Sequence, residues 1–106
     1  MTWIEESLSR LCTELHVRRM FGGYGIYEGE HFFAIVHRDR FYLKVDDEMA
    51  KTLSKLGSKP FQPSKKQTLH RYYDLPIDVL ENSQELRHWT LRSIACAQNQ
   101  IKKRKS

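Results

Sequence analysis

The segment Arg18–Val45, RRMFGGYGIYEGEHFFAIVHRDRFYLKV, decides the fold of this chain of 106 residues. It alternates short apolar runs with breaks rich in glycine and charge, which is typical of strands joined by tight turns. Phe32–Val36 is a continuous apolar run, as expected of a central strand covered on both faces. Tyr24–Tyr27 precedes this run, and Phe41–Val45 follows it with the period-two pattern of a strand that has one buried face. The segment therefore predicts a β-meander.

A helix is predicted before the meander. Thr2 and Glu5 have the spacing of a capping box, and the apolar residues that follow recur at helical intervals: Ile4, Leu8, Leu11, Cys12 and Leu15. The helical spacing breaks near Arg18. The glycine cluster from Gly22 to Gly25 then demands backbone freedom that a helix interior does not tolerate. The chain is expected to pass from this first helix directly into the strand at Tyr24.

A second helix is predicted after the meander, because Asp46 favours a helix start and Gly57 a helix end. Pro60 prevents its continuation. Residues 58–67, with two prolines and few apolar side chains, are expected to form a mobile loop. Thr68–Tyr73 has enough β-formers for a further strand, although its polar residues favour a position at a sheet edge or a polar face.

Two more helical segments complete the chain. Pro76 fits the first turn of a short helix that runs through Leu80. Asn82 or Ser83 can cap a final long helix, whose apolar residues recur through Ile101. The predicted order is α-β-β-β-α-β-α, a two-layer α+β domain with helices packed on a mostly antiparallel sheet. Residues 1–101 form this single domain, and residues 102–106 form a basic C-terminal tail.

The positive charge is concentrated at the C-terminus. The net charge is +5, but Lys102, Lys103, Arg104 and Lys105 carry four of the 18 basic charges, which leaves 14 against 13 acidic residues. The folded body therefore need not present a broad cationic face. Such a terminal cluster suits a solvated helix end, whose dipole favours cations, or an auxiliary contact with phosphate. No apolar run is long enough to cross a bilayer, and a cytoplasmic protein is expected.

The residues that most often carry chemistry show no catalytic or metal-binding pattern. Gly23 and Gly25 lack the third glycine of a dinucleotide-binding turn and lead into a strand, whereas that turn opens a helix. Cys12 and Cys96 are far apart in sequence and are interpreted as reduced, buried residues. The histidines have no metal-ligand spacing: His16, His31, His37, His70 and His88. We therefore expect no enzyme activity and no cofactor.

Arg18 and Arg19, followed by Met20 and Phe21, admit two interpretations. In one, the arginines cap the preceding helix and pair with local acids while Met20 and Phe21 enter the core. In the other, the guanidinium groups form a recognition patch for a partner's carboxylates or for a phosphate backbone. The candidate contact residues comprise this pair, three lysines of the body and the tail: Arg18, Arg19, Lys44, Lys65, Lys66, Lys102, Lys103, Arg104 and Lys105.

Several motifs together resemble the N-terminal domain of the TfoX/Sxy family of bacterial competence regulators. They are Met20-Phe21-Gly22-Gly23 with Gly25, Tyr42-Leu43-Lys44 before Asp46, Pro60-Phe61, Tyr73 before Leu75-Pro76, and Trp89. The resemblance covers nearly the whole chain. It implies a non-enzymatic domain that regulates transcription of DNA-uptake genes alongside the cyclic-AMP receptor protein. Full-length members carry a further C-terminal helical domain, whereas this chain ends at Ser106, so a stand-alone domain is expected.

Two functions follow as expectations. The first is a regulatory domain that acts through protein–protein interaction, and the alternative is direct nucleic-acid binding through the basic residues. A homodimer is also expected, since a short aromatic meander with a modest core often exposes an apolar edge or face that a second copy can cover.

Overall fold

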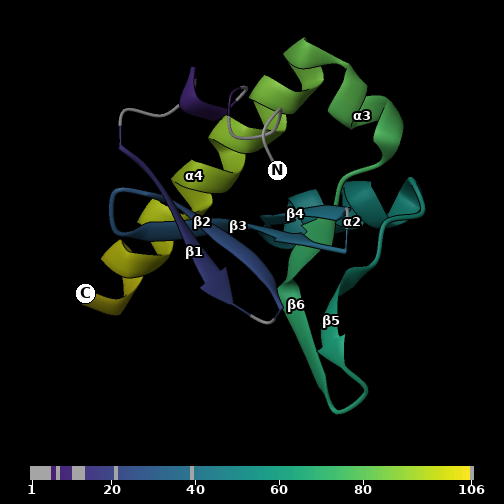
Figure 1. Cartoon of the computed structure of the whole chain (residues 1–106), viewed down its shortest axis with the longest axis horizontal. Helices are drawn as coiled ribbons and strands as arrows, with labels where there is room; N and C mark the ends of the chain where they lie inside the picture. Colours follow the sequence, from purple (N-terminus) through teal and green to yellow (C-terminus); the bar gives the residue numbers. More distant parts are fainter. Residues whose placement is uncertain (1–5, 7, 11–13, 21, 39, 106) are drawn as a thin grey trace.

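The computed structural model describes residues 6, 8–10, 14–20, 22–38 and 40–105, and for residues 99–105 it describes the backbone alone. Within these residues it contains an antiparallel sheet of order β1-β2-β3-β4-β6-β5 (Figure 1). The strands are β1 Leu15–Met20, β2 Gly23–Glu28, β3 His31–His37, β4 Arg40–Lys44, β5 Pro60–Ser64 and β6 Gln67–Asp74, and the labelled helices are α2 Asp47–Lys55, α3 Ile77–Glu81 and α4 Ser83–Lys105.

Tight turns join the first three strands. The pairs Met20–Gly23 and Glu28–His31 close connections of two residues each. Gly22 and Gly29 occupy these connections with φ of 76° and 62°, a left-handed conformation that glycine adopts without strain. The predicted meander is thus confirmed.

A bulge shapes β3. Ile26 pairs with Ala34 and Tyr27 pairs with Phe32, so Phe33 is an extra residue opposite β2. Phe33 and Ala34 are both fully buried in the same core cluster. The Ser93 hydroxyl of α4 donates a hydrogen bond of 2.9 Å to the Phe33 carbonyl oxygen, which ties the longest helix to the centre of the sheet.

The helix ends follow the predicted signals. An Asp46 carboxylate oxygen accepts a 2.8 Å hydrogen bond from the Met49 N–H at the start of α2, and Gly57 follows its end with φ of 92°. The side-chain oxygen of Asn82 accepts bonds of 3.1 Å from the N–H groups of Gln84 and Glu85 at the start of α4. These oxygens satisfy donors that have no partner within the helix.

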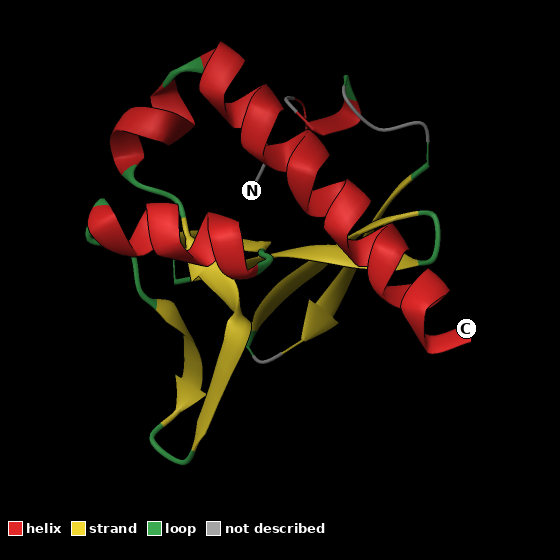
Figure 2. Ribbon diagram, turned by 180° about the vertical axis from the view of Figure 1, so that it is seen from behind, coloured by secondary structure: helices red, strands yellow, loops and turns green. Residues whose placement is uncertain are grey.

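Two hydrophobic clusters lie on the two faces of the sheet. The helices gather on one side (Figure 2), where the larger cluster joins strand residues to residues of α2 and α4, among them Phe33, Leu43, Met49, Leu53 and Trp89. The smaller cluster consists of Ile35, Tyr42, Phe61 and Tyr72. Ile35 alternates with Ala34 and Val36 of the larger cluster, so this second cluster occupies the opposite face.

The α+β class is confirmed, but the predicted element order is wrong. Residues 15–20 form the strand β1, whereas Leu15 was predicted at the end of the first helix. Arg18 and Arg19 therefore do not cap a preceding helix. The Thr2 and Glu5 capping box lies outside the described residues.

The predicted loop at residues 58–67 is also wrong over most of its length. Residues 60–64 form β5, which pairs with β6. As a result, β6 lies inside the sheet between β4 and β5, and not at an edge. The predicted central strand at Phe32–Val36 and the short helix after Pro76 are confirmed.

Candidate interaction surface

The strand β1 is one edge of the sheet. All six of its residues pair with β2 in unbroken antiparallel register, from Leu15–Glu28 to Met20–Gly23. No strand of the described part of the chain lies on its other side. An edge strand of this kind presents a row of unpaired backbone N–H and C=O groups.

Arg18 and Arg19 are exposed on this edge strand. Because successive side chains of a strand point to opposite faces, the two guanidinium groups lie on opposite sides of the sheet. The Arg18 guanidinium carbon is 5.3 Å from the centre of the Tyr27 ring, a cation–π contact. Neither arginine forms an ion pair with a carboxylate of the described residues.

Arg19 lines an open depression of about 460 Å³ at the β1–β2 turn, together with Met20, Gly22, Gly23 and Tyr24. The backbones approach closely here. A Cβ added at Gly23 would collide with the Val36 carbonyl oxygen. Glycine is therefore required where β2 lies against β3 beside this depression.

Three contacting aromatic rings with a cation at each end form a row across the sheet, and we call it the ring row: Arg18, Tyr27, Phe32, Tyr72 and Lys44. The ring centres of Tyr27 and Phe32 are 5.1 Å apart, and so are those of Phe32 and Tyr72. The Lys44 ammonium nitrogen lies 5.4 Å from the centre of the Tyr72 ring. The row is thus apolar in the middle and positively charged at both ends.

Tyr72 is the most enclosed ring of the row. Its hydroxyl donates a hydrogen bond of 3.4 Å to the Phe32 carbonyl oxygen. Burial raises the pKa of Tyr72 well above its ordinary value of 10.0, and the neighbouring Tyr27 and Cys96 add to this increase. Like any tyrosine, Tyr72 is neutral at physiological pH, so the row carries no negative charge at its centre.

The rings of the ring row are partly occupied by their neighbours. The three rings contact one another, and the cations of Arg18 and Lys44 lie over the outer two. The row was missed in the sequence because Tyr72 reaches Phe32 from a distant part of the chain, and the pairing of Tyr27 with Phe32 depends on the bulge at Phe33.

The structure does not gather the candidate cations into one patch. Arg18 and Lys44 lie at opposite ends of the ring row. Lys65 and Lys66 form the turn between β5 and β6, which projects from the sheet. Lys102–Lys105 form the last turn of α4, at a different end of the molecule in both views (Figures 1 and 2).

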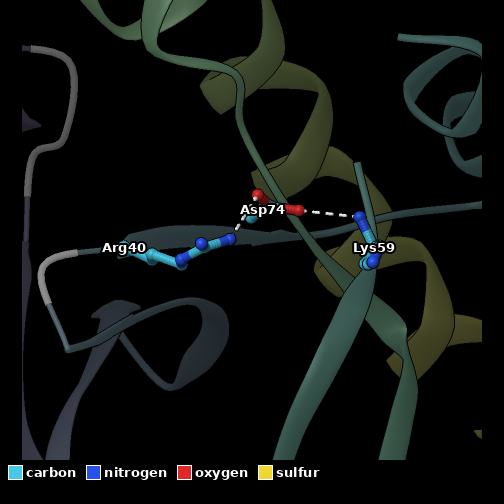
Figure 3. Close-up of polar contacts among 3 residues, drawn as sticks. All are labelled: Arg40, Lys59 and Asp74. Carbon is cyan, nitrogen blue, oxygen red and sulfur yellow. Dashed lines mark hydrogen bonds and ion pairs between the residues drawn. The ribbon is translucent and has the colours of Figure 1, made fainter. Parts of the chain in front are cut away.

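The opposite edge of the sheet is fastened by Asp74. One of its carboxylate oxygens accepts a 2.7 Å bond from the Lys59 N–H, and the other lies 3.6 Å from an Arg40 guanidinium nitrogen (Figure 3). The Asp74 N–H donates to the Lys59 carbonyl oxygen at 3.2 Å. These contacts join the start of β5 to the end of β6, so we assign Asp74 a structural role.

The described histidines, cysteine and carboxylates do not assemble a metal site. Among these residues, no three that could ligate a metal lie close together. Cys96 is half-buried on α4. The helices within the described residues include none that is both long and apolar enough to span a bilayer.

A two-layer α+β domain with one basic, open sheet edge is therefore the structural class. The family model of the TfoX N-terminal domain matches residues 6–97, and the chain belongs to this family. It is also similar to the DNA transformation protein TfoX of Haemophilus influenzae, with 31% identity over 91 residues. That alignment covers 82% of this chain and 42% of the relative, so the chain spans about two fifths of the relative's length.

Proposed function

We propose that this chain is a regulatory domain of the competence type, which acts by binding another protein and not by catalysing a reaction. Membership of the TfoX N-terminal domain family is the observation that carries the proposal. The similar Haemophilus influenzae protein is a DNA transformation protein, and the shared domain extends that role to this chain as a hypothesis.

The geometry favours protein binding over nucleic-acid binding as the mode of action. Protein partners commonly add a strand to an exposed sheet edge, and β1 offers such an edge with two exposed arginines. A nucleic-acid surface would need cations that lie together along a backbone track. Lys65 and Lys66 lie instead on a projecting turn, away from Arg18 and Arg19.

The test is a transcript measurement in the cells that encode the chain. We expect that raising and then removing the protein changes a coherent group of transcripts in opposite directions. Capture of the protein from the same cells should recover a component of the transcription machinery, with RNA polymerase and the cyclic-AMP receptor protein as the first candidates. Unchanged transcripts together with no such component would contradict the proposal.

Direct nucleic-acid binding is the second candidate, and the terminal cluster Lys102–Lys105 supports it. Neutralising phosphates makes affinity fall with salt, by about 0.9 in the logarithmic slope for each phosphate contact on duplex DNA. Deleting residues 102–105 removes four cations and should then lower the slope. Lys51→Gln with Lys55→Gln removes exposed cations of α2 that are not candidate contacts, and is the control. No measurable binding at low salt would remove this candidate.

A further inference from the structure

The free side of β1 can be assigned group by group. The Gly29 N–H donates a 2.7 Å bond to the Glu14 carbonyl oxygen, directly before the first β1–β2 pair. Bonded and non-bonded pairs alternate in an antiparallel ladder, so His16, Arg18 and Met20 bond to β2. The backbone groups of Leu15, Val17 and Arg19 consequently point away from β2, toward the open edge.

The other edge of the sheet is closed to pairing. β5 contains Pro60 and Pro63, which have no N–H to donate. Its register against β6 is interrupted at two places. β1 has neither proline nor bulge and keeps its register over its whole length. Proline, irregularity and charge are the usual protections of an edge strand, and of these β1 has the charge of Arg18 and Arg19.

The charge on β1 selects the chemistry of an added strand. Arg18 and Arg19 are exposed without an ion-pair partner among the described residues, and His16 between Leu15 and Val17 is exposed too. A strand laid beside β1 would place its side chains next to these groups, where acids are favourable. A second copy of β1, paired along its full length, would instead bring four arginines into one short interface.

We propose that β1 pairs with an extended, acidic segment of a partner protein, which adds a strand to the sheet through the outward groups of Leu15, Val17 and Arg19. The proposal rests on the proposed function, because it names the kind of partner segment that a protein-binding domain of this structure takes. Backbone bonds supply the affinity, and carboxylates opposite Arg18 and Arg19 supply the selectivity.

The test uses a capped peptide of the length of β1 that carries two consecutive glutamates between valines, titrated into the isotopically labelled full chain. Consecutive glutamates point to opposite faces of the added strand, so one can lie opposite Arg18 and the other opposite Arg19. We expect the largest NMR shift changes in β1 and slower amide exchange at Val17 and Arg19. Two control peptides separate the contributions. One replaces glutamate with lysine, and the other keeps glutamate but carries N-methyl groups on its pairing edge. Both should bind about fivefold more weakly or not at all.

Two variants of the chain test the same edge. Val17→Pro removes an outward N–H while keeping the bonds to β2, and should weaken binding about fivefold. If that variant does not fold, Arg18→Gln with Arg19→Gln should weaken binding while Lys65→Gln with Lys66→Gln does not. Binding that tolerates N-methylation, shifts confined to other strands, or concentration-dependent dimers that exclude the peptide would each overturn the proposal. The transcript response would still stand in that case, so the two failures are distinguishable.

Discussion

The two edge strands of the sheet, β5 and β1, differ in what limits their pairing with other chains. β5 carries two prolines, has an interrupted register and is fastened through Phe61 and Asp74. β1 is regular, has no proline and exposes two arginines. An edge strand normally needs protection against pairing with other chains. β5 is protected by proline and an irregular register, whereas β1 is protected by the charge of Arg18 and Arg19, which disfavours basic strands and leaves the edge open to acidic ones.

The edges also differ in what holds them to the sheet. Phe61 is fully buried and contacts the rings of His37 and Tyr42, so a large side chain secures β5. β1 is held by its backbone ladder, by the cation–π contact of Arg18 with Tyr27 and by Leu15 and Val17, which are only partly buried where they pack on the larger cluster. Substitutions should therefore affect stability differently on the two sides.

The largest effect is expected at β5. Phe61→Ala removes a buried ring from the smaller cluster and should lower the free energy of unfolding by about 3–5 kcal/mol. Leu69→Ala is the control, because Leu69 packs on the same cluster but is only partly buried. Urea unfolding measures both. Equal losses would mean that Phe61 does not secure this edge.

Gly23→Ala should have the next largest effect, on the β1 side. The added methyl group would meet the Val36 carbonyl oxygen, and backbone cannot move as cheaply as a side chain. We expect a loss of about 2–3 kcal/mol. Gly22→Ala is the comparison, since the space around it is open and the cost is only that of its φ of 76°, about 1 kcal/mol. A Gly23 variant as stable as the Gly22 variant would contradict the close approach of the strands.

Alkaline pH should lower the free energy of unfolding through Tyr72 and Tyr42, which lie on the sheet face of the smaller cluster. Burial raises the pKa of Tyr72, and burial with the nearby Asp74 carboxylate raises that of Tyr42. Above the ordinary value of 10.0 the unfolded chain releases these protons more readily than the folded chain, so stability falls as pH rises. Each group contributes at most about 1.4 kcal/mol per pH unit.

Tyr72→Phe separates this contribution from general alkaline unfolding. It loses one long hydrogen bond, so at neutral pH the cost should be below about 1 kcal/mol. Above pH 10.0 its stability should decline less steeply than that of the unchanged chain. Parallel declines would show that the Tyr72 hydroxyl ionises as it does in water.

The smallest expected effect concerns Asp74. Asp74→Asn retains an acceptor for the Lys59 N–H but loses the charge beside Arg40, and should cost about 1 kcal/mol. Asp47→Asn is the control, because Asp47 is almost fully exposed and lies 3.7 Å from Arg71. This substitution should leave the free energy of unfolding unchanged within measurement. Thermal unfolding would compare the two variants, and equal stabilities would show that Asp74 does not stabilise the position of β5.

The two edge strands, β1 and β5, are the elements that were not predicted from the sequence. The period-two pattern in Leu15–Met20 is short, and Leu15 also continues a helical series from Leu8. In β5, the prolines that protect the edge also hide the strand. Interior strands such as β3 are apolar enough to be recognised from sequence, whereas an edge strand keeps a wet side and a weaker pattern.

The candidate surface was predictable only in part. A recognition patch was one of two interpretations of Arg18 and Arg19 from the sequence, and their presence on an edge strand required the structure. The ring row could not be predicted, because Tyr27, Phe32 and Tyr72 meet through strand register and the bulge at Phe33. A bulge of one residue changes which side chains share a face of the sheet, and the local sequence pattern does not predict this bulge.

Amide hydrogen exchange in the free chain tests the central claim, the open edge at β1, most directly. We predict fast exchange at Val17 and Arg19, whose N–H groups point outward, and slow exchange at His16 and Arg18, which bond to β2. The alternation should be independent of protein concentration. Slow exchange at all four amides in the free chain would show that β1 is already covered, and would contradict the account.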